Sequence, residues 1–586
     1  MNTMYEIAKY FLPAACFLLI AVLFMLLPDL RRCDLGKESG ARRFDRIDVL
    51  TVTGLTLCYA VAAFTGLGDT KAPQTFVNLE NETAAIRLDV NGGSAAKLML
   101  YTGVGIGRYS VDYTTDGSDS YHLGDFEQSH AEVLKWQPVE IDYGITGGTV
   151  FIRGSGNVWL GEVAAVTGDG RVVPASADRP ELTDEQSLCP SRQTFLNSSY
   201  FDEIYHARTA WEHLNGVYPY EITHPPLGKI IIGLGIRLFG MTPFGWRFSG
   251  TLFGVLMLPI LYFFAKKLFG GRMAPAACTA LMATDFMHFV QTRIATIDTY
   301  AVFFILLMYL FMYLFISEGR LWALALCGIS FGLGAASKWT CFYAGAGLAV
   351  IWLLWVMHGF RAGTLRFGGF VKNALFCVVF FVLVPCAIYY LSYYPYGVAQ
   401  GKTDLLSRDY LNIVLDNQRY MFSYHSQLVA THPYSSAWYQ WLLDIRPILY
   451  YLDYLPDGRH VSFGAFVNPV LCWGGLLALF PMGCLAVMRR DQVSAFILLG
   501  YLAQLLPWVL VSRLTFAYHY FPCTVFLALA LGRCFDVMLR NVRFGRLYVN
   551  GFAALSLAAF ILFYPCLAGL PVKPGILRSW LPTWPF

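Results

Sequence analysis

Residues 297–316 read IDTYAVFFILLMYLFMYLFI, a run in which Asp298 is the one charged side chain. Such a run is long enough to cross the hydrocarbon core of a bilayer as a helix, which needs about 20 mostly apolar residues. The whole chain has the same character, because 56% of its 586 residues are hydrophobic and 14% are charged. Soluble globular proteins carry about 25% charged residues. The composition therefore predicts an α-helical polytopic membrane protein.

Apolar runs of this kind recur along the chain. We count about twelve candidate transmembrane helices, most of them separated by polar or basic segments. Breaks between neighbouring runs are shortest within 274–316 and 321–357. The candidate spans are residues 10–28, 48–67, 244–264, 274–291, 297–316, 321–337, 341–357, 374–394, 467–487, 493–511, 517–535 and 547–568.

Basic residues indicate how these spans are oriented. Lys and Arg concentrate in the cytoplasmic loops of membrane proteins, and here every second loop is short and basic. The long segments 68–243 and 395–466 then lie on the outer side of the membrane. The predicted cytoplasmic loops carry Arg31, Arg32, Lys37, Arg42, Arg43 and Arg46, then Lys266, Lys267 and Arg272, then Arg320, then Arg361, Arg366 and Lys372, then Arg489 and Arg490, and last Arg540, Arg543 and Arg546.

Residues 75–178 differ from the rest of the chain. Short runs alternate apolar and polar side chains, as in 85–90 and 149–153, and turn sequences such as Asn91-Gly92-Gly93 separate them. Short strands at this spacing are typical of a β-sandwich, and the pattern resembles a jelly-roll, galactose-binding-like module. Trp136 is then either a glycan-binding platform or, as is more usual for Trp, a core residue.

Composition also excludes some functions. The net charge is +4 and no long basic run occurs, so nothing indicates a nucleic-acid partner. The 14 Cys lie mostly inside apolar runs and no CxxC occurs, which argues against a disulfide framework or a zinc site.

An acidic motif follows the predicted sandwich. Apolar residues recur at helical spacing from Tyr200 to Leu214, which indicates an amphipathic helix at the outer interface. Asp202 and Glu203 fall in its first turn, and His206 lies one turn above Asp202. Two acids at a helix start can simply complement the helix dipole. They can also serve an active site, where a carboxylate acts as a general base.

Polar motifs near other predicted span ends fall on the same outer side. Each basic residue taken singly can be an interfacial anchor, but ionisable residues gathered at one surface indicate a shared polar site. The motifs are His224-Pro225-Pro226-Leu227-Gly228-Lys229, Phe244-Gly245-Trp246-Arg247, Gln291 to Asp298, Ala336-Ser337-Lys338-Trp339, His432 to Trp441 and Arg513 to Pro522.

In order and combination, the acidic motif and these segments resemble the protein O-mannosyltransferase family over about residues 195–566. The resemblance implies a GT-C fold and a polyprenyl- or dolichyl-phosphate mannose donor used at the outer membrane face. It also implies Ser and Thr acceptors in a translocated protein. Two spans and a β-module precede the acidic motif here, where the family usually has one span. The MIR-type domain of eukaryotic members is missing, which favours a bacterial type.

The chemistry of this reaction suggests roles. A lipid phosphate leaves readily and needs positive charge rather than a general acid, whereas the acceptor hydroxyl needs a base. We expect Asp202 to be the base of one inverting displacement and Glu203 to orient the acceptor. No metal or other cofactor is expected, because side chains supply the cations. The remaining expected site residues are Arg247, Arg293, Lys338, Arg513 and His519 for the donor phosphate or the acidic pair, and His206, His224, His432 and Trp438 for the acceptor or pocket.

Together these inferences divide the chain and name its partners. Expected partners are polyprenyl-phosphate mannose, Ser/Thr-containing secreted or membrane proteins and membrane lipid, with the protein translocon as a further candidate. The expected regions are 1–74, two transmembrane helices with a basic cytoplasmic loop; 75–178, an extracytoplasmic β-sandwich; 179–394, the catalytic transmembrane region; 395–466, an extracytoplasmic loop; and 467–586, a C-terminal four-helix transmembrane region.

Three alternatives stay open on the sequence. A GT-C transferase could use the same donor on a lipid or cell-wall glycan acceptor, which the β-module would bind. A lipid-linked sugar transporter would suit twelve spans, but the charged motifs lie at one surface rather than at the midplane. If the chain were a sugar-sensing receptor, the acidic motif would have no function, which argues against this alternative.

Overall fold

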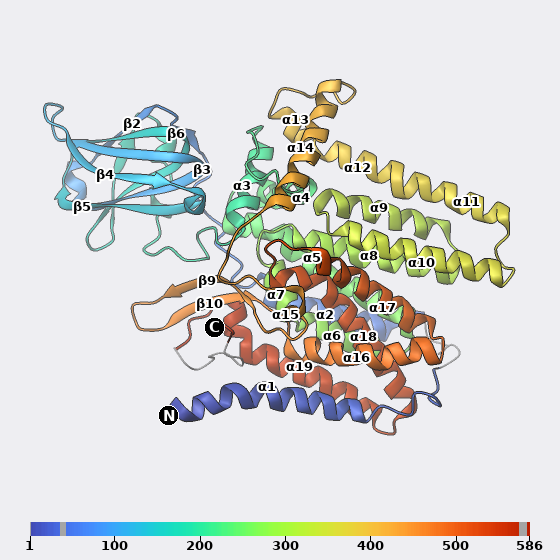
Figure 1. The fold of residues 1–586 in the computed structure, drawn as a ribbon. Helices are drawn as coiled ribbons and strands as arrows, with labels where there is room; N and C mark the ends of the chain where they lie inside the picture. Colours follow the sequence, from blue (N-terminus) through green and yellow to red (C-terminus); the bar gives the residue numbers. More distant parts are fainter. Residues whose placement is uncertain (1, 36–42, 574–582, 586) are drawn as a thin grey trace. The chain divides into compact units, whose positions relative to one another are not determined.

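The computed structural model (Figure 1) describes residues 2–35, 43–573 and 583–585. Two basic residues of the first predicted cytoplasmic loop, Lys37 and Arg42, lie outside the described residues. The chain divides into two compact units. The helical unit comprises residues 1–65, 222–228 and 250–586, and the sheet unit comprises residues 66–221 and 229–249.

Long apolar helices build the helical unit, as the composition predicted. Among the described residues, nine helices are long and apolar enough to cross a membrane, and three shorter apolar helices accompany them. Every predicted span overlaps one of these helices. The long ones include α2 (Arg46–Phe64), α5 (Pro243–Phe269), α8 (Asp298–Glu318), α10 (Cys341–Arg361), α11 and α12 (Phe367–Val378, Val384–Ser392), α16 (Pro469–Met488), α17 (Gln492–Leu505), α18 (Phe521–Asn541) and α19 (Gly545–Ala568), and the shorter apolar segments lie in α1 (Asn2–Met25), α6 (Met273–Ala283) and α9 (Leu321–Ser337).

The predicted span at 274–291 is two helices rather than one. After α6 ends, Asp285 caps α7 (Phe286–Thr292) by accepting a hydrogen bond from His288 N at 3.0 Å. The same side chain accepts a hydrogen bond from Asn468 N at 2.9 Å. An aspartate that satisfies free N–H groups favours the start of a new helix over continuation of the old one.

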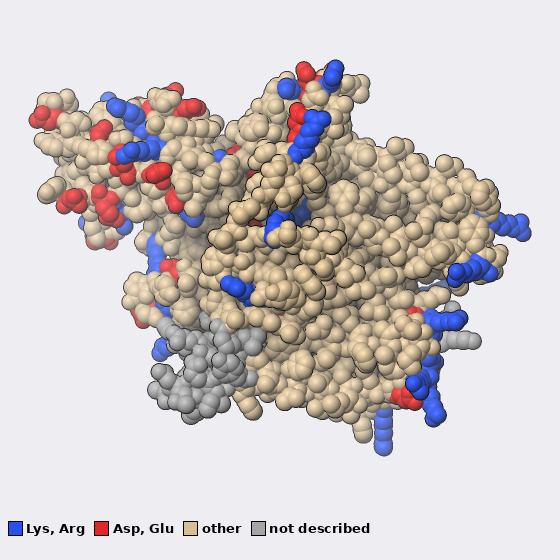
Figure 2. All heavy atoms as spheres, in the orientation of Figure 1, with Lys and Arg blue, Asp and Glu red and all other residues tan. Residues whose placement is uncertain are grey.

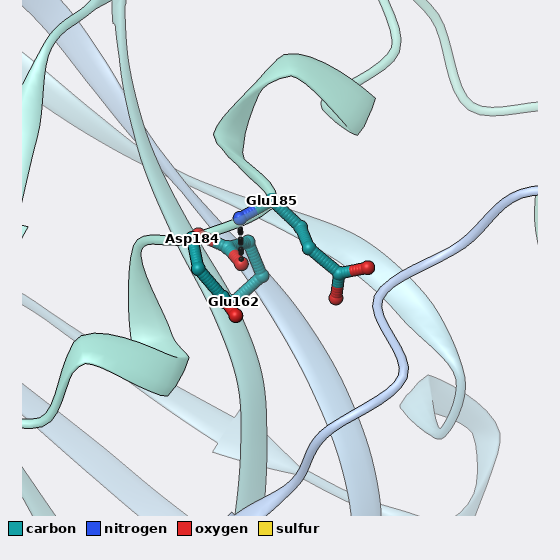
Figure 3. A group of neighbouring side chains, drawn as sticks. All are labelled: Glu162, Asp184 and Glu185. Atoms are coloured by element: carbon teal, nitrogen blue, oxygen red, sulfur yellow. Dashed lines mark hydrogen bonds between the residues drawn. The ribbon is translucent and has the colours of Figure 1, made fainter.

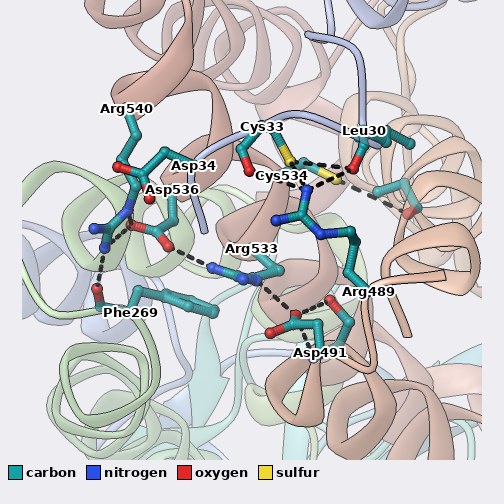
Figure 4. Close-up of polar contacts among 12 residues, drawn as sticks. Leu30, Cys33, Asp34, Phe269, Arg489, Asp491, Arg533, Cys534, Asp536 and Arg540 are labelled. Carbon is teal, nitrogen blue, oxygen red and sulfur yellow. Dashed lines mark hydrogen bonds and ion pairs between the residues drawn. The ribbon is translucent and has the colours of Figure 1, made fainter. Parts of the chain in front are cut away.

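Lys and Arg of the helical unit gather where helices end, beside a surface almost free of charge (Figure 2). Several of them also join elements (Figure 4). Arg489 donates hydrogen bonds to backbone carbonyls of the loop 30–33. Arg533 in α18 binds Asp491 at 3.0 Å and Asp536 at 2.6 Å. The basic residues at these ends therefore fasten the loop after α1 and the start of α17.

The sheet unit contains eight antiparallel strands connected in one sheet. β3 (Ala95–Thr114) and β6 (Thr149–Thr167) pair along nearly their whole length; β5 (Lys135–Ile145) pairs with the first half of β3 and β4 (Tyr121–Gln128) with the second. The sheet curls over a core of buried apolar side chains (Figure 1). The predicted inserted sheet domain is present. In place of two separate sheets it has one curled sheet, and the long strands β3 and β6 run through both halves of that sheet. The other strands are β1 (Val77–Asn78), β2 (Thr83–Leu88), β7 (Val172–Val173) and β8 (Ala175–Ala177).

Each unit contains further elements. The sheet unit also holds α3 (Glu203–Leu214) and most of α4 (Leu227–Phe239). Segment 395–466, expected as a loop, is folded: α14 packs its apolar face on Tyr393, whose hydroxyl donates a hydrogen bond to Asn417 at 2.6 Å. This segment comprises α13 (Tyr394–Val398), α14 (Arg408–Gln427), α15 (Trp438–Trp441), β9 (Ile448–Tyr454) and β10 (His460–Ala465).

Candidate active site

Asp202 lies where an irregular loop meets α3. Its neighbour Phe201 has a φ of 48°, in the left-handed region that a bulky side chain rarely adopts. Such a conformation costs on the order of 1–3 kcal/mol, and it is found where surrounding structure imposes it, often at functional sites. Asp202 is the N-cap of α3, is partly exposed and makes no side-chain capping hydrogen bond. Its carboxylate is therefore not used to close the helix end.

Glu203, the next residue, has a different environment. Its side chain is fully buried, and both carboxylate oxygens bind Arg247, with Nε–Oε1 and Nη2–Oε2 distances of 2.7 Å. Arg247 is also fully buried and donates to the carbonyl oxygens of Leu67 and Ser198 at 2.9 Å each. This bidentate pair fixes the loop before α3 to α5. Both carboxylate oxygens of Glu203 are therefore committed to Arg247, and its expected role toward the acceptor stays a prediction.

A second buried polar group surrounds His206. The imidazole is 5% exposed, and its Nδ1 lies 4.0 Å from the carboxylate of Glu221. Glu221 also pairs with Lys229, the last residue of the HPPLGK motif, whose side chain is buried. Burial lowers the pKa of Lys229, and the charge of Glu221 opposes that shift. His206 and Lys229 thus share one carboxylate inside the sheet unit.

In the helical unit, basic side chains converge on a cavity of about 480 Å³. His224, Lys338, His425 and Arg513 line it, and aromatic walls complete it, among them Trp339. They come from distant parts of the chain: the turn before α4, the end of α9, the end of α14 and the turn before α18. A cavity with several cations and apolar walls has the character of a site for an anionic group joined to an apolar one.

The two permanent cations of this cavity differ in their partners. Lys338 Nζ lies 2.7 Å from Asp298 Oδ1, and both side chains are nearly buried. Arg513 is partly exposed, and in the described part of the chain it forms no ion pair with a carboxylate. Within the described residues, no carboxylate therefore balances the positive charge of Arg513. The positive charge of Lys338 is held in place by its ion pair with Asp298.

The two histidines of the cavity face each other. Their ring centroids are 5.2 Å apart, and His425 Nε2 lies 2.8 Å from the carbonyl oxygen of Thr223. Burial, together with the charges of His224 and Arg513, lowers the pKa of His425 to about 4. His425 is therefore neutral near pH 7 and can donate its Nε2 proton to the Thr223 carbonyl.

Comparisons with known proteins agree on one family. A family model for the C-terminal four-transmembrane region of protein O-mannosyltransferase matches residues 410–584, and one for dolichyl-phosphate-mannose-protein mannosyltransferase matches residues 223–389. Together they cover more than half of the chain. The chain belongs to the protein O-mannosyltransferase family.

Relatives of this family member include bacterial, fungal and animal proteins. The polyprenol-phosphate-mannose–protein mannosyltransferase of Mycolicibacterium smegmatis is 27% identical over 67% of this chain and 88% of its own length. The enzyme of that name from Mycobacterium tuberculosis is 25% identical over 67% and 87%. The Saccharomyces cerevisiae protein O-mannosyltransferase Pmt1-Pmt2 complex bound to the sugar donor has a TM-score of 0.59 at 14% identity, covering 66% of this chain and 89% of that one. This likeness supports the GT-C fold.

Eight of the eleven expected site residues do not line the cavity: Asp202, Glu203, His206 and Arg247, which belong to the sheet unit, and Arg293, His432, Trp438 and His519. Arg293 donates to the carbonyl oxygens of Ala63 and Thr65 at 3.0 and 2.8 Å, so its guanidinium caps the end of α2. His519 is 6% exposed and packs among aromatic rings. His432 packs edge-on against Phe516. Trp438 is partly buried, and its ring packs edge-on against the ring of Tyr439.

The cavity-lining residues that sequence reasoning overlooked include His425, Tyr343 and Trp508. For His425 a signal was present. The buried face of α14 recurs every three or four residues from Tyr410 to Met421, and His425 is the next position on that face. Tyr343 and Trp508 gave no such signal, because they lie within apolar runs of the predicted spans and resemble their neighbours.

Proposed function

We propose that this chain transfers mannose from polyprenyl-phosphate mannose to Ser or Thr hydroxyls of translocated proteins. The observation that carries the proposal is the cation-lined cavity in a chain of the protein O-mannosyltransferase family. The names of its mycobacterial relatives support the same donor and a protein acceptor. The protein translocon is the further partner that this acceptor class suggests.

The proposed reaction is a single inverting displacement. The acceptor hydroxyl oxygen forms a bond to the anomeric carbon of mannose while the bond between that carbon and the phosphate oxygen breaks. Asp202 takes the hydroxyl proton, and polyprenyl phosphate leaves with the bonding electron pair. Arg513 and Lys338, with His224, balance the charge that develops on the leaving phosphate. We assign Glu203 and Arg247 the task of holding the loop that carries Asp202.

No metal is required in this scheme. A divalent cation commonly neutralises a leaving phosphate, and here Arg and Lys side chains offer the same charge. We propose that the site acts on the extracytoplasmic face of the cell membrane, because the alternating basic loops orient the chain that way. Mannosyl transfer measured in the presence of EDTA tests whether the reaction requires a metal.

The proposal can be tested with the purified full-length protein in detergent. Labelled polyprenyl-phosphate mannose and a Ser/Thr peptide should yield mannosylated peptide, and a peptide with Ala in place of every Ser and Thr should yield none. Asp202→Asn should lower transfer by about 100- to 10,000-fold, the usual contribution of a general base. The matched control is Asp142→Asn, an exposed aspartate of β5.

Two outcomes would contradict the proposal. Label that passes to a lipid or cell-wall glycan but to no peptide would assign the glycan-acceptor alternative. Unchanged transfer in Asp202→Asn would remove Asp202 from the mechanism while leaving the donor assignment intact.

A further inference from the structure

A group of three acidic side chains lies in the sheet unit, apart from the residues discussed above. Glu162 belongs to β6, and Asp184 and Glu185 lie between two short 3₁₀ turns that follow β8 (Figure 3). Each offers one carboxylate oxygen, and these oxygens all lie within 4.8 Å of one another. Like charges at such distances repel strongly when solvent is excluded.

Glu162 makes this cluster unusual. Its side chain is fully buried, and one oxygen, Oε2, accepts a hydrogen bond from Glu185 N at 3.0 Å. The other oxygen, Oε1, is buried and has no hydrogen-bond partner among the described residues. A buried carboxylate oxygen without a partner is costly, and native structures rarely leave one unless an ion or water satisfies it.

Lys71 lines a cavity together with Asp184 and Glu185. Among the described residues, however, none of the three carboxylates forms an ion pair with a Lys or Arg. Tyr101, which lies opposite Glu162 in the β3–β6 pairing, adds a second buried polar atom without a partner, its hydroxyl. Two paired residues of neighbouring strands are thus short of polar partners at the same place in the sheet.

A route to the cluster from solvent exists. Asp184 and Glu185 line a cavity of about 490 Å³ within the sheet unit, and Asp184 is exposed. Gln74, whose backbone N–H donates to Glu185 at 2.9 Å, also lines it. The cavity is large enough to hold an ion with several coordinating waters.

We propose that Glu162, Asp184 and Glu185 bind a divalent cation, and that this cation is Ca²⁺. All three ligands are hard carboxylate oxygens, the type that Ca²⁺ and Mg²⁺ prefer over softer metals. A strand and a loop supply them without fixed octahedral geometry, and Ca²⁺ accepts six to eight oxygens in irregular arrangements where Mg²⁺ demands a regular one. The bound ion fastens the segment after β8 to β6. The site does not depend on the proposed transferase activity.

The test uses the purified full-length protein in detergent after removal of metal with EGTA. Titration with CaCl₂ alone should show one saturable binding event per chain by calorimetry, and Ca²⁺ should raise the melting temperature more than MgCl₂ at the same concentration. Asp184→Asn and Glu162→Gln should abolish both effects. Glu181→Gln should retain them, because Glu181 is an exposed acid of the same segment outside the cluster.

Asp184→Asn is the decisive variant, since an exposed side chain can be changed without harm to folding, whereas Glu162→Gln alters the core. Absence of Ca²⁺ binding in the native protein would overturn the proposal. Equal stabilisation by Mg²⁺, or retained binding in Asp184→Asn, would also overturn it. Mannosyl transfer that is unchanged in Asp184→Asn, with binding lost, would support the site as separate from the reaction.

Discussion

Two consecutive acids, Asp202 and Glu203, show how environment separates side chains of the same chemistry. Glu203 has both oxygens committed to Arg247 and no exposed surface, so it cannot accept a proton from an incoming hydroxyl. Asp202 retains solvent access at the start of α3. Phe201, which directly precedes the two acids, has a left-handed backbone conformation.

This separation predicts opposite phenotypes. Glu203→Gln should lower the free energy of unfolding by about 3–5 kcal/mol, because it leaves the buried Arg247 charge without its partner. Asp202→Asn should leave stability nearly unchanged while it removes transfer. Thermal melts of both variants, beside transfer assays, check this. A stable Glu203→Gln variant with full activity would show that the ion pair is not needed.

Arg513 should determine donor affinity. Arg513→Ala is expected to raise KM for polyprenyl-phosphate mannose by about 10- to 100-fold, the worth of a charge-assisted hydrogen bond, with a smaller change in KM for the acceptor peptide. Arg513→Lys should recover part of the loss. Arg459→Ala serves as the control, because Arg459 is an exposed arginine of the β9–β10 hairpin. Equal KM values in native and Arg513→Ala protein would exclude contact with the donor.

His425 predicts a pH dependence of stability. Its folded-state pKa of about 4 lies below the roughly 6.5 of an exposed histidine. Between these pH values the unfolded chain binds a proton that the folded chain does not, so stability should decrease as pH falls from 6.5 toward 4. His425→Gln, which keeps a donor for the Thr223 carbonyl, should show a weaker decrease in melting temperature over this range. An identical pH profile would contradict the assignment.

At the scale of elements, one buried ion pair joins α2 to α5. Lys266 Nζ lies 2.9 Å from Asp48 Oδ2, and the hydroxyl of Tyr262 donates to Asp48 Oδ1 at 2.7 Å. All three side chains are buried. The neighbouring residue Lys267 pairs at 2.8 Å with Glu318 of α8, but that pair is partly exposed. Adjacent lysines of one helix therefore offer a matched comparison.

We predict that Asp48→Asn destabilises the protein by about 3–5 kcal/mol, because it leaves the Lys266 charge buried without its counterion. Glu318→Gln should cost less than about 1 kcal/mol, since solvent screens the exposed pair. Chemical denaturation of the purified protein measures both. Similar costs for the two variants would mean that burial does not distinguish the pairs.

At the scale of the whole molecule, the alternating basic loops predict which segments face the cytoplasm. Gly117 in the β3–β4 turn and Gly363 in the α10–α11 turn each have open space around them, so both should accept an inserted epitope tag. In intact spheroplasts an antibody should detect the tag at 117 and should detect the tag at 363 only after permeabilisation. The reverse pattern would overturn the proposed extracytoplasmic site.

Sequence alone sufficed for the helical membrane architecture, the inserted sheet domain and the family. These depend on long apolar runs, alternating short runs and ordered motifs, all of which are local in the chain. Among the expected site residues it singled out His224, Lys338 and Arg513, and these three line one cavity. It could not exclude Arg293, because an arginine at a helix end has the same local pattern whether it meets a ligand or caps a carbonyl.

The sequence by itself therefore determined which segments partition into lipid or water and which chemical groups are available. What only the tertiary structure decided was which groups meet: the carboxylate of Glu203 with Arg247, the cavity shared by four distant basic residues, and the acids around Glu162. The physical reason is that a local sequence pattern reflects the free energy of transfer from water to lipid, and each side chain contributes to this free energy independently of the others. Ion pairs and cavities depend on distances between segments far apart in the chain, which folding alone sets.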